Sequence, residues 1–197
     1  MRKLAILIAG AALLAGCQTA PPPPPPPPPP VDLNNLLMAP GFLANAASGD
    51  QFEIQSSQLA LQMSQNVAVH NFANLLIADH THMGQVMAGT AHSAGVPPPP
   101  PVLLPAQQAM LDQLQASGSG PAFDAAFRNA QISAHQNALA LMQNYAASGD
   151  VPALRAAAQQ AIPTIQTHLN QAVLLNSAPP PPPPPPMPLP GRAGERG

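Results

Sequence analysis

Four ionisable side chains occupy positions where helices of this sequence would face a protein core. His80, His135 and His168 each lie in the middle of an apolar stripe, because residues three, four, seven and eleven positions apart share one face of an α-helix. Glu53, the lone glutamate of the helical region, interrupts a fourth such stripe. Burying these groups is costly unless they find partners. The pattern therefore predicts that the four side chains meet near a common layer.

Three neutral imidazoles and one carboxylate suit a zinc, copper or single iron ion. The four side chains are therefore predicted to form one metal site. Asp79 and Asp124 flank the set and could orient an imidazole by accepting a hydrogen bond from its second nitrogen. A metal-free polar network is the alternative, since buried histidines often serve only as hydrogen-bond partners that fix helix register.

The set differs from a di-iron site, which uses two Glu-x-x-His pairs and two further glutamates. Only Asp79 and His82 have that spacing here, and His82 lies about 200° around the helix from His80. The sequence also has no Gly-rich phosphate loop, no nucleophile elbow and no thiol nucleophile. An oxidase or peroxide-consuming enzyme built on one metal ion is therefore the least favoured of three functions, because the carboxylates for such a site are missing. The methionines on the same stripes are interpreted as core-filling residues rather than copper ligands: Met83, Met87 and Met142.

The elements that must position these side chains are predicted to be helices. Ala, Gln, Leu and Met dominate the region between two proline runs, and β-branched residues are sparse. Helices are expected at about residues 39–64, 67–94, 106–116, 121–147 and 151–175. Ser48-Gly49-Asp50 is expected to bend or break the first helix, Asp150 to cap the last, and Pro163 to kink it.

Four long helices and one short helix predict an all-α fold. A tight link near Gln65 and another at Gly149 would each join two antiparallel helices. The long connection, residues 95–120, would cross between the two pairs and carry the short helix. This is the arrangement of a ferritin-like antiparallel four-helix bundle with one long crossover.

Several motifs between about residues 35 and 177 carry a family resemblance. They are Phe42-Leu43-x-x-Ala46-Ala47, Glu53-Ile54, Leu59-Ala60, Phe72-Ala73-x-x-Leu76-Ile77-x-Asp79-His80, Phe123-Asp124-x-x-Phe127, His135, Pro163 and His168-Leu169. Together they resemble a bacterial family of unknown function, often described as predicted outer-membrane proteins with a ferritin-like four-helix fold. The resemblance implies an extracytoplasmic bundle in which the three stripe histidines and Glu53 match recurrent polar positions. It implies no reaction.

The first seventeen residues are similar to a bacterial lipoprotein signal. Arg2 and Lys3 precede a short apolar run, and Leu14-Ala15-Gly16-Cys17 ends like a lipobox. Residues 1–16 are therefore expected to be removed as a signal peptide, and Cys17, the only cysteine, to carry the lipid. An ordinary signal peptide followed by an incidental cysteine is the alternative. Gln18, in place of an inner-membrane retention aspartate, favours the outer membrane with the chain facing the periplasm.

Proline runs flank the helical region. Residues 17–31 comprise the lipidated cysteine and a polyproline spacer, whose ten prolines would form a rod of roughly 30 Å. Residues 178–197 are expected to form a proline-rich disordered tail. Without Arg2 and Lys3, four basic residues remain against eight acidic ones, a formal net charge of −4. This charge argues against nucleic-acid partners.

The predicted organisation is therefore a signal peptide, a lipidated spacer, a helical bundle over residues 35–177 and a tail. The expected function is a lipid-anchored, periplasm-facing bundle that binds one metal ion for buffering or sensing. The alternative is a non-enzymatic structural or interaction module of the cell envelope with a metal-free His/Glu network. The predicted partner is the membrane, through the lipid, and the sequence identifies no protein partner.

Overall fold

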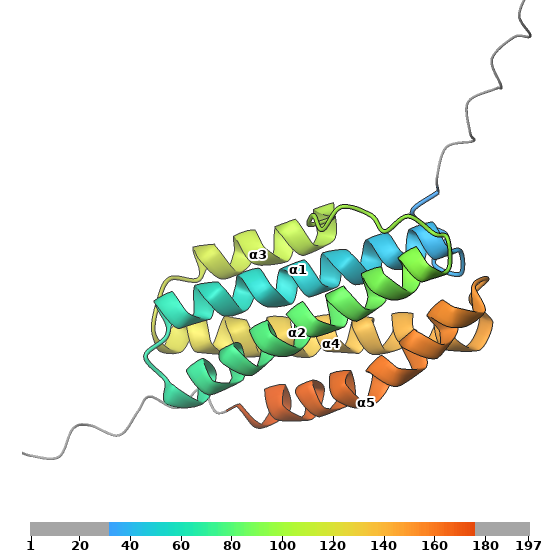
Figure 1. The fold of residues 1–197 in the computed structure, drawn as a ribbon. Coiled ribbons are helices and arrows are strands. Elements are labelled where there is room, and N and C mark those ends of the chain that lie inside the picture. The colour runs from blue at the N-terminus through green and yellow to red at the C-terminus, as the bar shows by residue number, and fades with distance from the viewer. Residues whose placement is uncertain (1–31, 176–197) are drawn as a thin grey trace, which may run out of the picture. The chain divides into compact units, whose positions relative to one another are not determined.

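The computed structural model describes residues 32–175, which form five helices and no strand (Figure 1). The helices are α1 (Ala39–Met63), α2 (Val67–Ser93), α3 (Pro105–Ala116), α4 (Pro121–Ser148) and α5 (Pro152–Leu174). The all-helical prediction is confirmed, and each predicted boundary lies within one residue of the observed one. None of the described helices combines the length and apolar character needed to cross a membrane. The predicted signal peptide, lipidated spacer and tail lie outside the described residues.

The four long helices pack as two antiparallel pairs, α1 with α2 and α4 with α5. The pairs come together because α1 packs against α4 and α2 against α5 (Figure 1). The Gly120 N–H donates to the Met63 carbonyl over 2.9 Å, so α4 begins beside the end of α1. Neighbouring long helices therefore run in opposite directions. The connection from α2 to α4 carries α3, which packs against α1 and α4.

The helix α1 runs unbroken through Ser48-Gly49-Asp50, where the sequence pattern predicted a bend or break. Ser48 Oγ accepts a hydrogen bond of 2.7 Å from the Leu104 N–H of the crossing connection. Asp50 is bonded to His80 of α2. Tertiary contacts made by these two side chains therefore offset the weak helix propensity of the segment.

Helix α2 ends at Ser93, two residues before Gly95. Gly95 has φ 74°, a left-handed conformation that glycine adopts without steric cost. The N–H groups of Gly95 and Val96 donate to the carbonyls of His92 and Ala91 at 3.0 and 2.9 Å. This bonding pattern satisfies the last carbonyls of the helix. Helix α5 contains Pro163, and Figure 1 shows that it bends along its length, as predicted.

Asp150 does not cap α5, contrary to the sequence prediction. Val151 occupies the N-cap position, and no side chain caps the helix. Asp150 Oδ1 instead accepts hydrogen bonds from the Ala39 N–H at 2.9 Å and the Tyr145 hydroxyl at 2.8 Å. Asp150 thus connects the α4–α5 link to the start of α1. Its carboxylate is used in these tertiary hydrogen bonds and not in a local N-cap hydrogen bond.

Two apolar clusters fill the bundle at opposite ends. The cluster nearer the α4–α5 link contains Phe42 stacked on Tyr145, with ring centroids 3.8 Å apart. The cluster at the other end contains four phenylalanines: Phe52, Phe72, Phe123 and Phe127. The three stripe histidines lie between residues of one cluster and residues of the other along their helices, so the candidate site lies at mid-height in the bundle.

Candidate metal centre

Three buried histidines from three different helices meet in the layer between the apolar clusters. His80 of α2, His135 of α4 and His168 of α5 are each at most 3% exposed. Their ring centroids lie 5.4 to 5.6 Å apart. One nitrogen of each ring lies within 4.8 Å of the corresponding nitrogens of the other two. The structure therefore brings together the histidines that the stripe pattern placed on core-facing helix surfaces.

Two of the rings are held by carboxylates. His80 Nδ1 donates to Asp50 Oδ1 over 2.8 Å, and His168 Nε2 donates to Asp79 Oδ2 over 2.8 Å. Each carboxylate comes from a neighbouring helix, Asp50 from α1 and Asp79 from α2. A carboxylate bonded to the outer nitrogen fixes both the ring orientation and the tautomer, as is typical around metal-ligating histidines.

The third ring is held by backbone. His135 Nδ1 donates to the Gln131 carbonyl oxygen over 2.8 Å. A carbonyl oxygen can only accept, so this nitrogen carries the hydrogen and Nε2 keeps a lone pair. Where Asp50 and Asp79 are ionised, they also only accept, so the lone pairs lie on His168 Nδ1 and, once the His80 ring is neutral, on His80 Nε2. All three nitrogens are buried and have no hydrogen-bond partner among the described residues.

The spacing of the three nitrogens is compatible with one ion. A zinc–imidazole bond of about 2.0–2.1 Å places two ligand nitrogens about 3.4 Å apart in a tetrahedral site. Here one nitrogen from each ring lies within 4.8 Å of those from the other two. Each ring would have to move inward by less than about 1 Å to reach that geometry. The three histidines could therefore hold a metal ion after a small contraction.

Burial sets the protonation of the rings. Burial and the neighbouring His80 lower the pKa of His135 to about 3, so that this ring is neutral at physiological pH. Burial also lowers the pKa of His168, against the opposing effect of Asp79. For His80, burial is outweighed by the hydrogen bond to Asp50 and the charge of Glu53, which raise its pKa. His80 must therefore lose a proton before it can bind a metal.

Glu53 lies at the edge of this centre and is not one of the converging group. Its Oε1 lies 3.6 Å from His135 Nδ1, the nitrogen already bonded to Gln131. The contact of the carboxyl with this ring is thus on the side of the bonded nitrogen, not of the free Nε2. Burial raises the pKa of Glu53 to about 7, against the opposing effects of His80 and Gln131. The sequence pattern identified Glu53 as inward-facing, but helix packing leaves it outside the set of three nitrogens.

Of the two aspartates predicted to orient an imidazole, Asp79 does so. It holds His168 of the adjacent helix rather than its neighbour in sequence, His80. Asp124 is eleven residues before His135, which separates them by about 16 Å along the helix, too far to hold that ring. Asp124 is buried, and its Oδ1 has no hydrogen-bond partner among residues 32–175. Asp124 and His135 share a helix face, but this did not indicate a contact between them.

Asp50 is the functional residue that the sequence reasoning missed. It was assigned to a segment expected to interrupt α1, so its side chain received no role. Its position three residues before Glu53 was the available indication, because residues three apart share a helix face. Burial raises the pKa of Asp50, and the hydrogen bond to His80 opposes that effect.

The sequence model of a family described as domain of unknown function (DUF4142) matches residues 24–175. The chain belongs to this family. The match includes all three histidines and both aspartates that hold them, and it confirms the predicted membership of a family of unknown function. No curated protein and no solved structure matches the chain.

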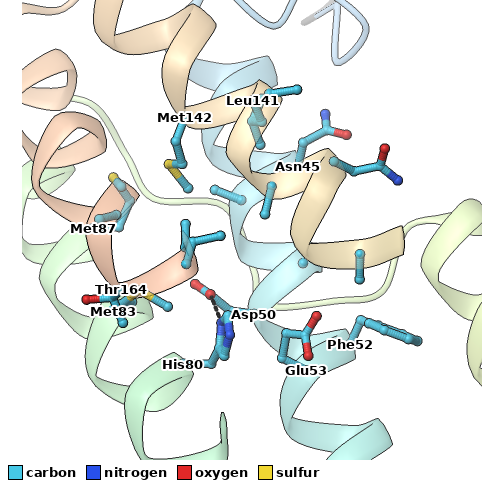
Figure 2. Close-up of a pocket in the computed structure, with 18 of the residues that line it drawn as sticks. Asn45, Asp50, Phe52, Glu53, His80, Met83, Met87, Leu141, Met142 and Thr164 are labelled. Atoms are coloured by element: carbon cyan, nitrogen blue, oxygen red, sulfur yellow. Dashed lines mark hydrogen bonds and ion pairs between the residues drawn. The ribbon is translucent and has the colours of Figure 1, made fainter. Parts of the chain in front are cut away.

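The centre also borders a cavity of about 630 Å³ (Figure 2). Asp50, Glu53 and His80 line the cavity on the side of the polar layer. Met87 belongs to the buried apolar cluster nearer the α4–α5 link and Met83 packs against it, as expected, and both also line the cavity (Figure 2). Small molecules could thus reach the edge of the centre through this cavity.

Proposed function

We propose that this member of the family binds one transition-metal ion through His80, His135 and His168, and that it buffers or senses that metal in the cell envelope. The observation that supports this function is the set of three free imidazole nitrogens on rings held from behind by acceptors. A buried polar atom left without a partner costs about 1–3 kcal/mol. One ion bound by all three nitrogens would remove the free-energy cost of burying each of them without a partner. Zinc, copper and iron all accept imidazole ligands.

The proposal includes a ferritin-like fold. The order of packing supports it: two antiparallel helix pairs, α1 with α2 and α4 with α5, are joined by one long connection. Ferritin-like bundles have the same connectivity. They also build metal centres from side chains that project inward from facing helices, as the three histidines do.

The proposal also includes an envelope location. It is supported by the charged start and short apolar run of the sequence, which end at the sole cysteine, Cys17. A lipid on Cys17 would hold the chain to a membrane, and Gln18 favours the outer membrane. Pro21–Pro30 would then separate the bundle from the lipid surface.

Metal analysis of the full chain, purified without a histidine tag, tests the metal-binding proposal. The chain is loaded with Zn²⁺, Cu²⁺ or Fe²⁺ in parallel, and about one ion per chain is expected for at least one of them. At a free-metal concentration about 100 times the Kd, that ion should also raise the free energy of unfolding by about 2.7 kcal/mol. His135→Ala should abolish both effects.

His82→Ala is the matched control, because His82 is an exposed histidine of α2 that is not part of the converging set. It should bind metal like the parent protein. Circular dichroism establishes that each variant is folded before its metal content is compared. A folded parent chain that takes up none of the three metals, or a folded His135→Ala variant that binds as the parent does, would contradict metal binding.

A metal-free structural module is the second candidate. The observation that favours it is that every ring already has one hydrogen bond, to Asp50, Asp79 or the Gln131 carbonyl. Such a polar layer could fix the register of the helices without an ion. A parent chain that remains folded, with its unfolding free energy unaffected by chelator or by added metal, would support this function.

A further inference from the structure

The cavity beside the centre is large enough for an organic molecule. Its volume of about 630 Å³ lies within the range of about 300–1,000 Å³ in which proteins bind small ligands. All four long helices contribute to its wall, on the side of the polar layer that faces the α4–α5 link (Figure 2). Many lining side chains are small or apolar, among them Met83, Met87, Ala138, Met142 and Ala161.

The polar end of the cavity contains a carboxylate oxygen that lacks a partner. Asp50 Oδ1 and His80 Nδ1 are bonded to each other there, and His80 Nε2 is one of the three free nitrogens of the metal centre. Glu53 is only 4% exposed, and its Oε2 has no hydrogen-bond partner among the described residues. A ligand group placed at this end and able to donate a hydrogen bond would satisfy that oxygen.

The lining also determines which charge a ligand can carry. No lysine or arginine is among the described residues that line the cavity, whereas two acidic side chains, Asp50 and Glu53, lie at its polar end. His80 is already paired with Asp50, so an anionic ligand would be desolvated without a free cation to pair with. Four methionines line the cavity: Met83, Met87, Met110 and Met142. Their thioethers favour aromatic rings, because sulfur makes favourable contacts with ring edges and methionine adapts to irregular shapes.

We propose that this cavity binds an uncharged, mostly apolar aromatic molecule of one or two rings, whose hydroxyl donates a hydrogen bond to Glu53 Oε2. The rings lie against the methionines and the small residues of the wall. The site is distinct from the metal proposal, because Glu53 is not one of the three converging side chains and the binding needs no ion.

The fluorescent probe 1-naphthol tests the ligand class. Binding to the full chain, kept metal-free with a chelator, is compared with binding of 1-naphthoate and naphthalene. The carboxylate probe should bind at least about tenfold more weakly than 1-naphthol, because its charge is desolvated without a partner. Naphthalene should also bind roughly tenfold more weakly, because it lacks the donor. In Glu53→Leu, the preference for 1-naphthol over naphthalene should disappear.

Cavity-filling variants test the location. Ala138→Leu of α4 and Ala161→Leu of α5 project new methyl groups into the cavity and should weaken 1-naphthol binding by at least about tenfold. Ala147→Leu is the matched control, because Ala147 is exposed on α4 and does not line the cavity. Binding of 1-naphthol by both filled variants at the parental strength, or of 1-naphthoate as tightly as 1-naphthol, would overturn the assignment. Zinc uptake by the same variants, measured in parallel samples without chelator, tests the metal centre separately.

Discussion

Replacing Glu53 with glutamine should change how the stability of the metal-free protein depends on pH. Burial raises the pKa of Glu53 from 4.5 to about 7, so the folded state favours the protonated acid. The stabilisation from such a group is fully present below about pH 4.5 and is lost as the pH rises through about 7. Glutamine has nearly the same shape and cannot ionise, so the variant lacks this loss.

The magnitude follows from the difference between the two pKa values. A difference of about 2.5, at about 1.4 kcal/mol for each unit, limits the effect to about 3.4 kcal/mol. Between pH 4 and pH 5.5, the unfolding free energy of Glu53→Gln should increase relative to that of the parent by about 1.2 kcal/mol. The gain should reach about 3 kcal/mol at pH 7. Any constant cost of burying the amide cancels, because only the change with pH is compared.

Urea unfolding of both proteins in the presence of chelator, at about pH 4, 5.5 and 7, measures this gain. Asp112→Asn is the matched control, because it removes a carboxylate that is exposed on α3. A difference between Glu53→Gln and the parent that stays constant over the three pH values, or shrinks as the pH rises, would refute the reasoning. The Glu53 carboxyl would then be ionised in the folded protein at neutral pH.

Two further predictions concern the end of the bundle that contains Tyr145. Gly149→Ala should lower the free energy of unfolding, measured in urea, by about 1–3 kcal/mol, because a Cβ there would lie 2.5 Å from the buried Tyr145 ring. Gly89→Ala is the control, because nothing lies within 4 Å of a Cβ at that position. Equal stability of the two variants would contradict this packing. Burial and the hydrogen bond to Asp150 raise the Tyr145 pKa to about 12, so its stabilisation persists below about pH 10 and is lost as the pH rises through 12. Because Tyr145 is the only tyrosine and tryptophan is absent, phenolate absorbance should show this midpoint directly, and a midpoint near 10 in folded protein would contradict it.

The helix boundaries were predictable because local chemistry decides them. Asn66 caps α2 with its side chain, which accepts from the Ala68 N–H. Gly95 ends the same helix in the left-handed conformation, and Pro121 begins α4 where no amide hydrogen is needed. In each case the decisive group lies within a few residues of the boundary. Asp150 shows the limit of this reasoning, because a good capping residue was used by Ala39 and Tyr145 instead.

The histidines of the centre were predictable for a similar reason. A helix of this bundle has one core-facing stripe, and the 3.6-residue period places His80, His135 and His168 on those stripes. Periodicity fixes the direction of a side chain around its own helix axis. It gives neither the height of that residue relative to a neighbouring helix nor the distance across the core.

The partners of these rings were decided only by the tertiary structure. Glu53 shares the inward direction but lies beside His135 Nδ1, outside the three free nitrogens. Asp79 of α2 is bonded to His168 of the neighbouring helix α5. Asp50 can bond His80 because α1 continues through a segment of weak helix propensity. The sequence alone thus determined which residues form helices and which histidines face inward, since both depend on neighbours along the chain. Packing decided which atoms meet and where a cavity is left, because contacts across helices depend on their relative heights and separations.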